Sequence, residues 1–201
     1  MLVDLSVVLN KNTPVYPGDP QIITKPNGIL DKDGYADSII TFGNHNGTHI
    51  DAPSHMIKGG KTLDQFSLEK FTGKGVHIKI QGKFDLSSIK NSKIEEDSFV
   101  LFETGMGEKY GSSEYFNDYP AITEDIAEFL VKKKVKIVGV DMCSVDHEPF
   151  PTHRILLKNE ILIIENLTNL SKLNNKKFSV FAFPLKLQID GSPARVVAQT
   201  E

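Results

Sequence analysis

The chain has 201 residues, of which 39% are hydrophobic and 24% are charged, and its formal net charge is -3. These values are typical of one globular domain and exclude a disordered or fibrous chain. The basic residues are scattered rather than gathered with aromatic residues, so we expect no nucleic-acid partner.

Membrane and secretory segments are not expected. No stretch approaches the roughly 20 apolar residues that cross a bilayer, and Met1–Ser6 carries an acid where a signal peptide needs basic residues. The single cysteine, Cys143, excludes an internal disulfide and follows an apolar run, where a buried thiol is ordinary. Together these features predict a cytoplasmic protein without membrane partners.

Short runs rich in β-branched and aromatic residues predict about seven or more strands. A cluster of prolines and glycine at positions 14–20 predicts a long irregular loop after the first run. His77 alternates with Val76 and Ile78 and is expected to face solvent. The expected strands span residues 3–9, 39–42, 76–81, 99–104, 136–140, 161–164 and 178–183.

Two helices are expected in the C-terminal half. Residues 123–134 place their apolar side chains on one helical face, and Thr123 is positioned to be the N-cap. A second helix is expected over residues 151–158. Because strands alternate with helices and no repeat or linker interrupts the chain, we predict a single mixed α/β domain over residues 1–201.

The segment from His45 to His55 holds three histidines and an aspartate, in a chain with only six histidines. Histidine and carboxylate are common ligands of zinc and also suit manganese or iron. Gly47, β-branched neighbours and Pro53 argue against a helix, so the segment should be extended. Same-parity residues of a strand share a face, so His49 and Asp51 can bind one ion.

His45 has the same parity, but a fully extended strand would place it about 13 Å from His49. It can therefore join the ion only if the backbone folds back at Asn46–Gly47, whose residue types suit a turn. Pro53 ends the extended stretch and displaces His55 from the other groups. A histidine close to a metal but outside its ligands is well placed for proton transfer.

Further ligands are expected in the C-terminal third. Glu165 directly follows a run of four apolar residues, and a carboxylate there is costly to bury unless it is paired or bound to a metal. His153 lies twelve residues earlier and is the leading partner. The residues alone leave Glu160, Glu148 and His147 as alternatives.

The sequence resembles the cyclase family that contains bacterial kynurenine formamidase and isatin hydrolase. The resemblance covers nearly the whole chain, and residues 45–55 match every fixed position of the family pattern H-x-G-T-H-x-D-x-P-x-H. Three flanking blocks agree in order. They are residues 4–6 through 14–19, residues 138–141 with 144–146, and residues 183–187 with 191–195.

Carried over residue by residue, the resemblance implies that His45, His49 and Asp51 bind a first divalent ion. Asp51 would bridge to a second ion bound by His153 and Glu165, whose separation equals that of the family's histidine and glutamate. Two zinc or manganese ions per subunit are expected. The family fold is a mixed α/β domain of the swivelling β/β/α kind, assembled as dimers or larger oligomers such as tetramers, with a partner chain near the site.

The resemblance also implies a mechanism and a substrate class. Bound divalent ions lower the pKa of water and polarise a carbonyl group, and His55 would be the catalytic histidine that moves the proton to the leaving nitrogen. The expected small-molecule substrate is an arylformamide such as N-formylkynurenine, an intermediate of tryptophan catabolism, which would give formate and an arylamine. Tyr16 stands where kynurenine formamidases typically have tryptophan, and it still offers an aromatic face to a substrate.

Three alternatives stay open. Family members also act on cyclic amides, so a cyclic imide or lactam such as isatin is the second candidate substrate. A protein that binds metal without catalysis is a different class of answer, although an intact His55 argues against it. A scaffold without metal is the last alternative.

Overall fold

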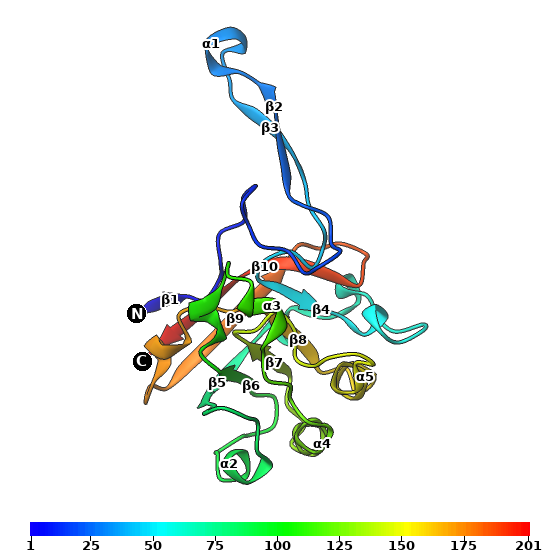
Figure 1. Cartoon of the computed structure of the whole chain (residues 1–201), viewed down its shortest axis with the longest axis vertical. Helices are drawn as coiled ribbons and strands as arrows, with labels where there is room; N and C mark the ends of the chain where they lie inside the picture. Colours follow the sequence, from blue (N-terminus) through cyan, green and yellow to red (C-terminus); the bar gives the residue numbers. More distant parts are fainter.

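The central feature of the protein, which a computed structural model describes over residues 1–201, is a sheet that closes on itself (Figure 1). Seven strands form a barrel in the order β10-β4-β8-β7-β6-β5-β9, and β9 pairs back onto β10. A further strand, β1, lies along β10. The mixed α/β fold expected from the sequence is confirmed. The strands of this sheet are β1 (Leu2–Asp4), β4 (His49–Asp51), β5 (Thr72–Lys79), β6 (Phe99–Glu103), β7 (Ile137–Val140), β8 (Leu162–Glu165), β9 (Phe178–Pro184) and β10 (Gly191–Thr200).

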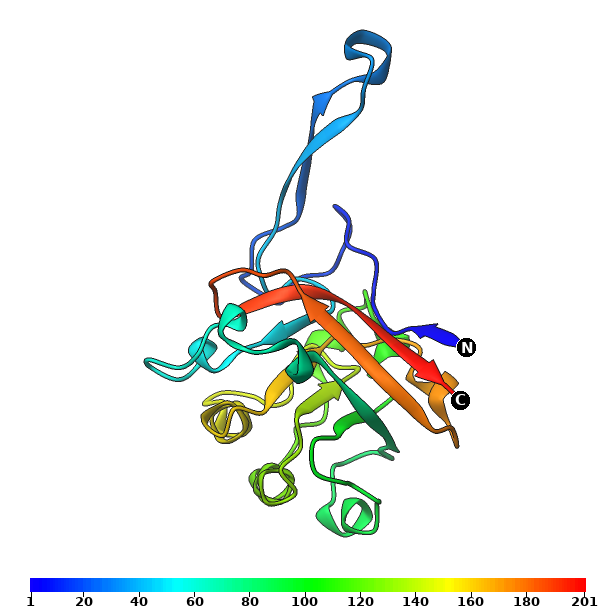
Figure 2. The ribbon, with the colours of Figure 1, turned by 180° about the vertical axis from the view of Figure 1, so that it is seen from behind.

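Strands β5, β6, β7 and β8 are parallel, and each connection between them contains a helix. Parallel strands need such crossover connections. The three helices lie together on one side of the barrel, and the long antiparallel strands β9 and β10 cross the opposite side (Figure 2). The helices are α2 (Leu86–Lys90), α4 (Glu124–Lys132) and α5 (Pro151–Lys158). A short helix, α3 (Glu114–Asn117), and five 3-10 turns complete the body, the turns being η1 (Pro53–His55), η2 (Leu63–Gln65), η3 (Leu68–Phe71), η4 (Met106–Lys109) and η5 (Leu170–Leu173).

Side chains on the two faces of the parallel strands enter two separate hydrophobic clusters. In β6, Phe99 and Leu101 point into the barrel, whereas Val100 and Phe102 pack against the helices. Every residue of β6, β7 and β8 is buried. This explains why these strands read as continuous apolar runs rather than as alternating ones.

A hairpin arm projects away from the barrel (Figure 1). It consists of β2 (Ile23–Gly28), α1 (Leu30–Asp33) and β3 (Asp37–Thr41), and its strands pair only with each other. Its exposed apolar side chains are Ile23, Ile29, Leu30, Tyr35, Ile39 and Ile40. A lone two-stranded hairpin is at best marginally stable in water, and this one leaves its apolar side chains exposed.

The sequence predicted most of the barrel but not all of it. Six of the seven expected strands lie within about two to four residues of the observed ones, five of them in the barrel and one, expected at 39–42, at β3 of the arm. The first expected strand is observed only over β1. The strands β2 and β10 were not predicted, and β4 was expected only as part of the extended histidine segment. The expectation that His77 faces solvent is wrong, because its ring is buried and its Nε2 lies 2.8 Å from the Glu103 carboxylate. None of the helices combines the length and the apolar composition that a membrane span requires.

Candidate metal centre and adjoining pocket

The backbone folds back between His45 and His49, as their spacing requires. The amide of Asn46 donates to the carbonyl of Gly43, and Gly47 takes a φ of 63°. A Cβ atom on Gly47 would lie 2.3 Å from the Leu9 side chain. Glycine is therefore needed here both for its conformation and for the space it leaves.

Strand β4 brings the two halves of the site together because it lies between β8 and β10. Its pairing places His49 opposite Glu165 on β8 and Asp51 opposite Gly191 on β10. The β4 residues are fully buried. Residues more than a hundred positions apart in the sequence thus become neighbours.

Two groups of potential ligands share Asp51. In the first, Asp51 Oδ1 lies 2.7 Å from His45 Nδ1 and 3.3 Å from His49 Nε2. In the second, His153 Nε2 lies 3.9 Å from Asp51 Oδ2 and 3.3 Å from Glu165 Oε1. The ligand atoms within each group all lie within 4.8 Å of one another. The structure therefore gathers all five residues for which the sequence predicted metal binding.

The second ring nitrogen of each candidate histidine ligand has a partner of its own. His49 Nδ1 lies 2.8 Å from the Gly47 carbonyl, and His153 Nδ1 lies 2.6 Å from Asp146 Oδ1. His45 Nε2 lies 3.0 Å from Asp190 Oδ2. Partners of this kind fix the tautomer and the ring orientation of metal-binding histidines. Each ring thus keeps one nitrogen free to face Asp51 or Glu165.

The electrostatics of the metal-free site favour protonated histidines. Burial alone lowers the pKa of His45, but the carboxylates of Asp51 and Asp190 outweigh it and raise this pKa to about 9. Burial likewise lowers the pKa of His153, and Asp146 and Glu165 outweigh it to give about 10. Burial raises the pKa of Asp51, whereas the neighbouring rings of His49 and His45 hold it well below its usual value. Protons thus supply the positive charge that these buried carboxylates require.

A divalent cation fits this arrangement. Asp51 Oδ2 is buried without a hydrogen-bond partner, and it lies on the side of the carboxylate that faces the second group. A buried oxygen without a partner is unfavourable unless a cation or a donor satisfies it. The nitrogen and carboxylate donor set suits zinc or manganese. These residues could therefore hold two ions with Asp51 between them.

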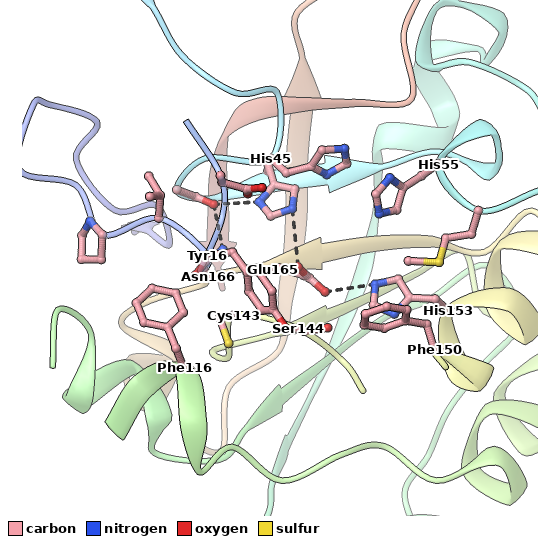
Figure 3. A pocket seen from close by; sticks show the side chains of 16 residues that line it. Tyr16, His45, His55, Phe116, Cys143, Ser144, Phe150, His153, Glu165 and Asn166 are labelled. Atoms are coloured by element: carbon pink, nitrogen blue, oxygen red, sulfur yellow. Dashed lines mark hydrogen bonds and ion pairs between the residues drawn. The ribbon is translucent and has the colours of Figure 1, made fainter. Parts of the chain in front are cut away.

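The candidate metal centre opens into a cavity of about 250 Å³. His55 lines the cavity, and its ring centroid lies 4.2 Å from that of His45. Phe116 and Phe150 stand on opposite sides, with Tyr16 between them (Figure 3). The edge of Tyr16 meets Phe116 at a centroid distance of 6.3 Å. The pocket thus combines aromatic walls with a polar end.

The three residues that the sequence left as alternative ligands lie outside the second group of potential ligands. Glu160 is exposed and pairs with Lys61, and Glu148 is also exposed. His147 Nε2 lies 3.2 Å from the Tyr119 carbonyl. None of the three belongs to a cluster that could hold an ion.

Several residues of the site were not predicted. Asp146 was noted only as part of a matching block, and Asp190 was not noted at all. Asn166 Nδ2 donates a hydrogen bond of 2.9 Å to the Gly47 carbonyl, and Asn166 Oδ1 accepts one of 2.8 Å from the Tyr115 hydroxyl. Asn166 therefore anchors the turn before β4. The only sequence signals were the position of Asn166 directly after Glu165 and that of Asp190 directly before Gly191-Ser192-Pro193.

Comparison with known proteins assigns the chain to a family. The model of the family described as putative cyclase matches residues 3–147. The chain therefore belongs to the putative cyclase family.

Two curated relatives cover almost the whole chain. The chain is 36% identical over 187 residues to an uncharacterized protein of Methanocaldococcus jannaschii, with 91% of each sequence covered. It is 31% identical over 206 residues to a kynurenine formamidase of Bacillus cereus, with 97% of this chain and 95% of the relative covered.

Solved structures share the fold. A potential metal-dependent hydrolase with cyclase activity has a TM-score of 0.84 at 29% identity and matches 98% of this chain and 96% of its own. Isatin hydrolase A from Labrenzia aggregata has a TM-score of 0.88 at 25% identity, with 98% and 93% covered. Together with the ligand clusters, these likenesses support a cyclase-family hydrolase that uses a divalent metal.

Proposed function

We propose that residues 1–201 form one metal-dependent amide hydrolase, with arylformamides as its leading substrate class. The observation that carries this proposal is the position of Asp51, whose two oxygens face two separate ligand groups at the end of a cavity. Sites with two neighbouring ions commonly hydrolyse amides and esters.

The protein side of the chemistry is the placement of ligands and of a proton carrier. His45, His49 and Asp51 would hold the first ion, and His153 and Glu165 would complete the second site with Asp51. Divalent ions bound there would supply Lewis acidity, which lowers the pKa of water and polarises a carbonyl group.

His55 is the proposed proton carrier. Its Nδ1 lies 3.2 Å from Asp190 Oδ2, and because a carboxylate only accepts, this nitrogen carries the proton. The other nitrogen, Nε2, is then free to accept a proton from the attacking water and to deliver it to the leaving nitrogen. The products of an arylformamide would be formate and an arylamine.

The aromatic side chains that line the cavity favour a planar aromatic substrate. Phe116 and Phe150 flank the site, and Tyr16 presents the third ring. Aromatic rings bind flat apolar groups through their faces and edges. The likeness to kynurenine formamidases supports N-formylkynurenine as the first substrate to test. The likeness to isatin hydrolase supports a cyclic amide as the second candidate.

We also propose that the chain assembles with copies of itself as a dimer or tetramer. The exposed apolar residues of the hairpin arm support this assembly, because monomers seldom leave such a row in water. We further propose that the protein is cytoplasmic and that it binds neither membranes nor nucleic acid.

The proposed activity is tested with the full chain loaded with zinc or with manganese. Turnover of N-formylkynurenine is followed by the appearance of kynurenine, and turnover of isatin by ring opening. We expect hydrolysis of one of them, its loss after chelation, and a decrease of at least about 100-fold in kcat in His55→Ala with unchanged metal content. Full activity in His55→Ala would contradict the mechanism, and no hydrolysis of either compound by the metal-loaded protein would contradict both substrate assignments.

A further inference from the structure

One carboxylate, that of Asp190, contacts both a candidate metal ligand and the proposed proton carrier. Its Oδ2 lies 3.0 Å from His45 Nε2 and 3.2 Å from His55 Nδ1. A carboxylate oxygen has two lone pairs and can accept both hydrogen bonds. The two rings lie against each other with their centroids 4.2 Å apart.

The carboxylate is itself held in place. Asn44 Nδ2 donates to Asp190 Oδ1 at 3.0 Å, and the backbone carbonyl of Asp190 accepts from the amide of Ala52 at 2.8 Å. The amide of Leu63 donates to the carbonyl of Ile189, so the loop before β10 is attached on both sides of the residue. Asp190 therefore has a fixed position relative to the end of β4.

We propose that Asp190 is a positioning residue that orients His45 toward the metal and His55 toward the substrate. This inference rests on the proposed function. The hydrogen bond to His45 Nε2 leaves Nδ1 facing Asp51, and the hydrogen bond to His55 Nδ1 leaves Nε2 for the reacting groups. Outer carboxylates of this kind hold a ligand ring in its binding orientation. Here the same carboxylate also holds the ring that moves the proton, so the metal and the proton carrier keep a fixed spacing.

The closing experiment compares the wild-type full chain with Asp190→Ala, Asp190→Asn and a surface control, Glu128→Ala. Glu128 is an exposed acid on α4, remote from the cavity. Two measurements need no substrate. The first is zinc affinity, measured by competition with a chromogenic chelator, and the second is the tautomer of His55, measured by long-range proton–nitrogen NMR of the zinc-loaded protein.

In wild type and in Glu128→Ala we expect His55 to carry its proton on Nδ1. In Asp190→Ala we expect the proton to move mainly to Nε2 and zinc affinity to fall about 10- to 100-fold. Asp190→Asn keeps an oxygen acceptor, so it should restore part of both properties. An unchanged tautomer and zinc affinity in Asp190→Ala would overturn the proposal. The loss of one ion per chain in both Asp190→Ala and His55→Ala would also overturn it, because His45, His55 and Asp190 would then be metal ligands together.

Kinetics add a test that a purely structural role would not pass. At saturating zinc, Asp190→Ala should lower kcat by about tenfold or more and leave KM within about threefold of the wild-type value. In a protein that already carries His55→Ala, the same substitution should lower kcat little further, because the two residues act together. Equal decreases in both backgrounds would overturn the link to His55. If the wild type hydrolyses no amide, the proposed function fails, while the tautomer and zinc measurements still decide the role of Asp190.

Discussion

His45 reaches the candidate metal centre only because β10 begins with a glycine. A Cβ atom on Gly191 would lie 2.5 Å from Cε1 and 3.0 Å from both nitrogens of the His45 ring. Contacts this short force the ring to move. The position of a predicted ligand thus depends on a residue almost 150 positions away.

This contact gives a first prediction. We expect Gly191→Ala to displace the His45 ring and to lower zinc affinity by about tenfold or more, because one ligand then misses its position. The β10 backbone pairs normally with β4 and should accept alanine. Zinc competition measures the affinity, and far-ultraviolet circular dichroism checks the fold. Unchanged zinc affinity in a folded variant would show that His45 is not a ligand.

Asp146 gives a second prediction, since it is buried and serves both His153 and helix α5. Its carboxylate accepts from the amides of Thr152 at 2.6 Å and His153 at 3.2 Å, as well as contacting His153 Nδ1. We expect Asp146→Asn to lower zinc affinity about 10- to 100-fold and the free energy of unfolding by about 1–3 kcal/mol. Chelator competition and urea denaturation of the metal-free protein measure the two effects. A variant that loses stability but binds zinc as tightly as wild type would contradict the metal role of His153.

The raised pKa values of the buried rings give a third prediction. With pKa values of about 9 for His45 and about 10 for His153, both rings are protonated at pH 7 without metal. A ring must lose a proton to bind an ion, so binding releases protons and becomes tighter as the pH rises toward these values. Calorimetric zinc titrations in buffers of different ionisation enthalpy count the protons. Binding that weakens between pH 6 and 8, or that releases no protons, would contradict this account.

At the scale of elements, β6 shows what the barrel depends on, because it is buried on both faces. Leu101 fills the interior and Phe102 packs under the helices, and both are fully buried. We expect Leu101→Ala to lower the free energy of unfolding by about 2–5 kcal/mol and Phe102→Ala by about 3–5 kcal/mol. Urea denaturation measures both. A small effect of either substitution would mean that one face of β6 is not part of a core.

The arm gives a prediction about assembly. Ile40 is 57% exposed and lies opposite Thr24 in the arm's own pairing. If copies of the chain cover the arm, Ile40→Glu should dissociate the oligomer, because a buried charge without a partner is strongly unfavourable. Lys90→Glu, at an exposed position of α2 outside the arm, is the control for an added negative charge. Sedimentation velocity measures the mass, and a wild-type monomer, or an oligomer that Ile40→Glu leaves intact, would contradict the proposed assembly.

The sequence predicted those strands and helices whose residue pattern is set by local burial. The apolar runs of β6, β7 and β8 and the amphipathic α4 were identified because burial sets their residue pattern directly. The strand β10 was missed because it begins with Gly-Ser-Pro-Ala, residue types that are depleted in strands or typical of turns. The pairing of β10 with β9 and β4 overrides that local preference. The burial of His77 was missed for the same reason, since it depends on Glu103 on another strand.

For the whole molecule, the spacing of His45, His49 and Asp51 predicted a convergent cluster, and the barrel provides it. The resemblance to a family supplied His153 and Glu165, which the residues alone left among alternatives. Asp190 could not be predicted, because it meets His45 and His55 only when β10 closes the barrel beside β4. Contacts that form only through this pairing leave little local signal in the sequence.

The proposed chemistry depends most on Asp51, which would serve both candidate ligand groups. The direct test is elemental analysis of the full chain and of Asp51→Asn after equilibration with zinc and removal of free ions, with amide hydrolysis measured on the same samples. We expect about two ions per wild-type chain, since paired ions act together in such hydrolases, and at most one per Asp51→Asn chain together with loss of activity. A wild-type protein that binds no ion, or an Asp51→Asn variant with the same metal content and activity, would contradict the account.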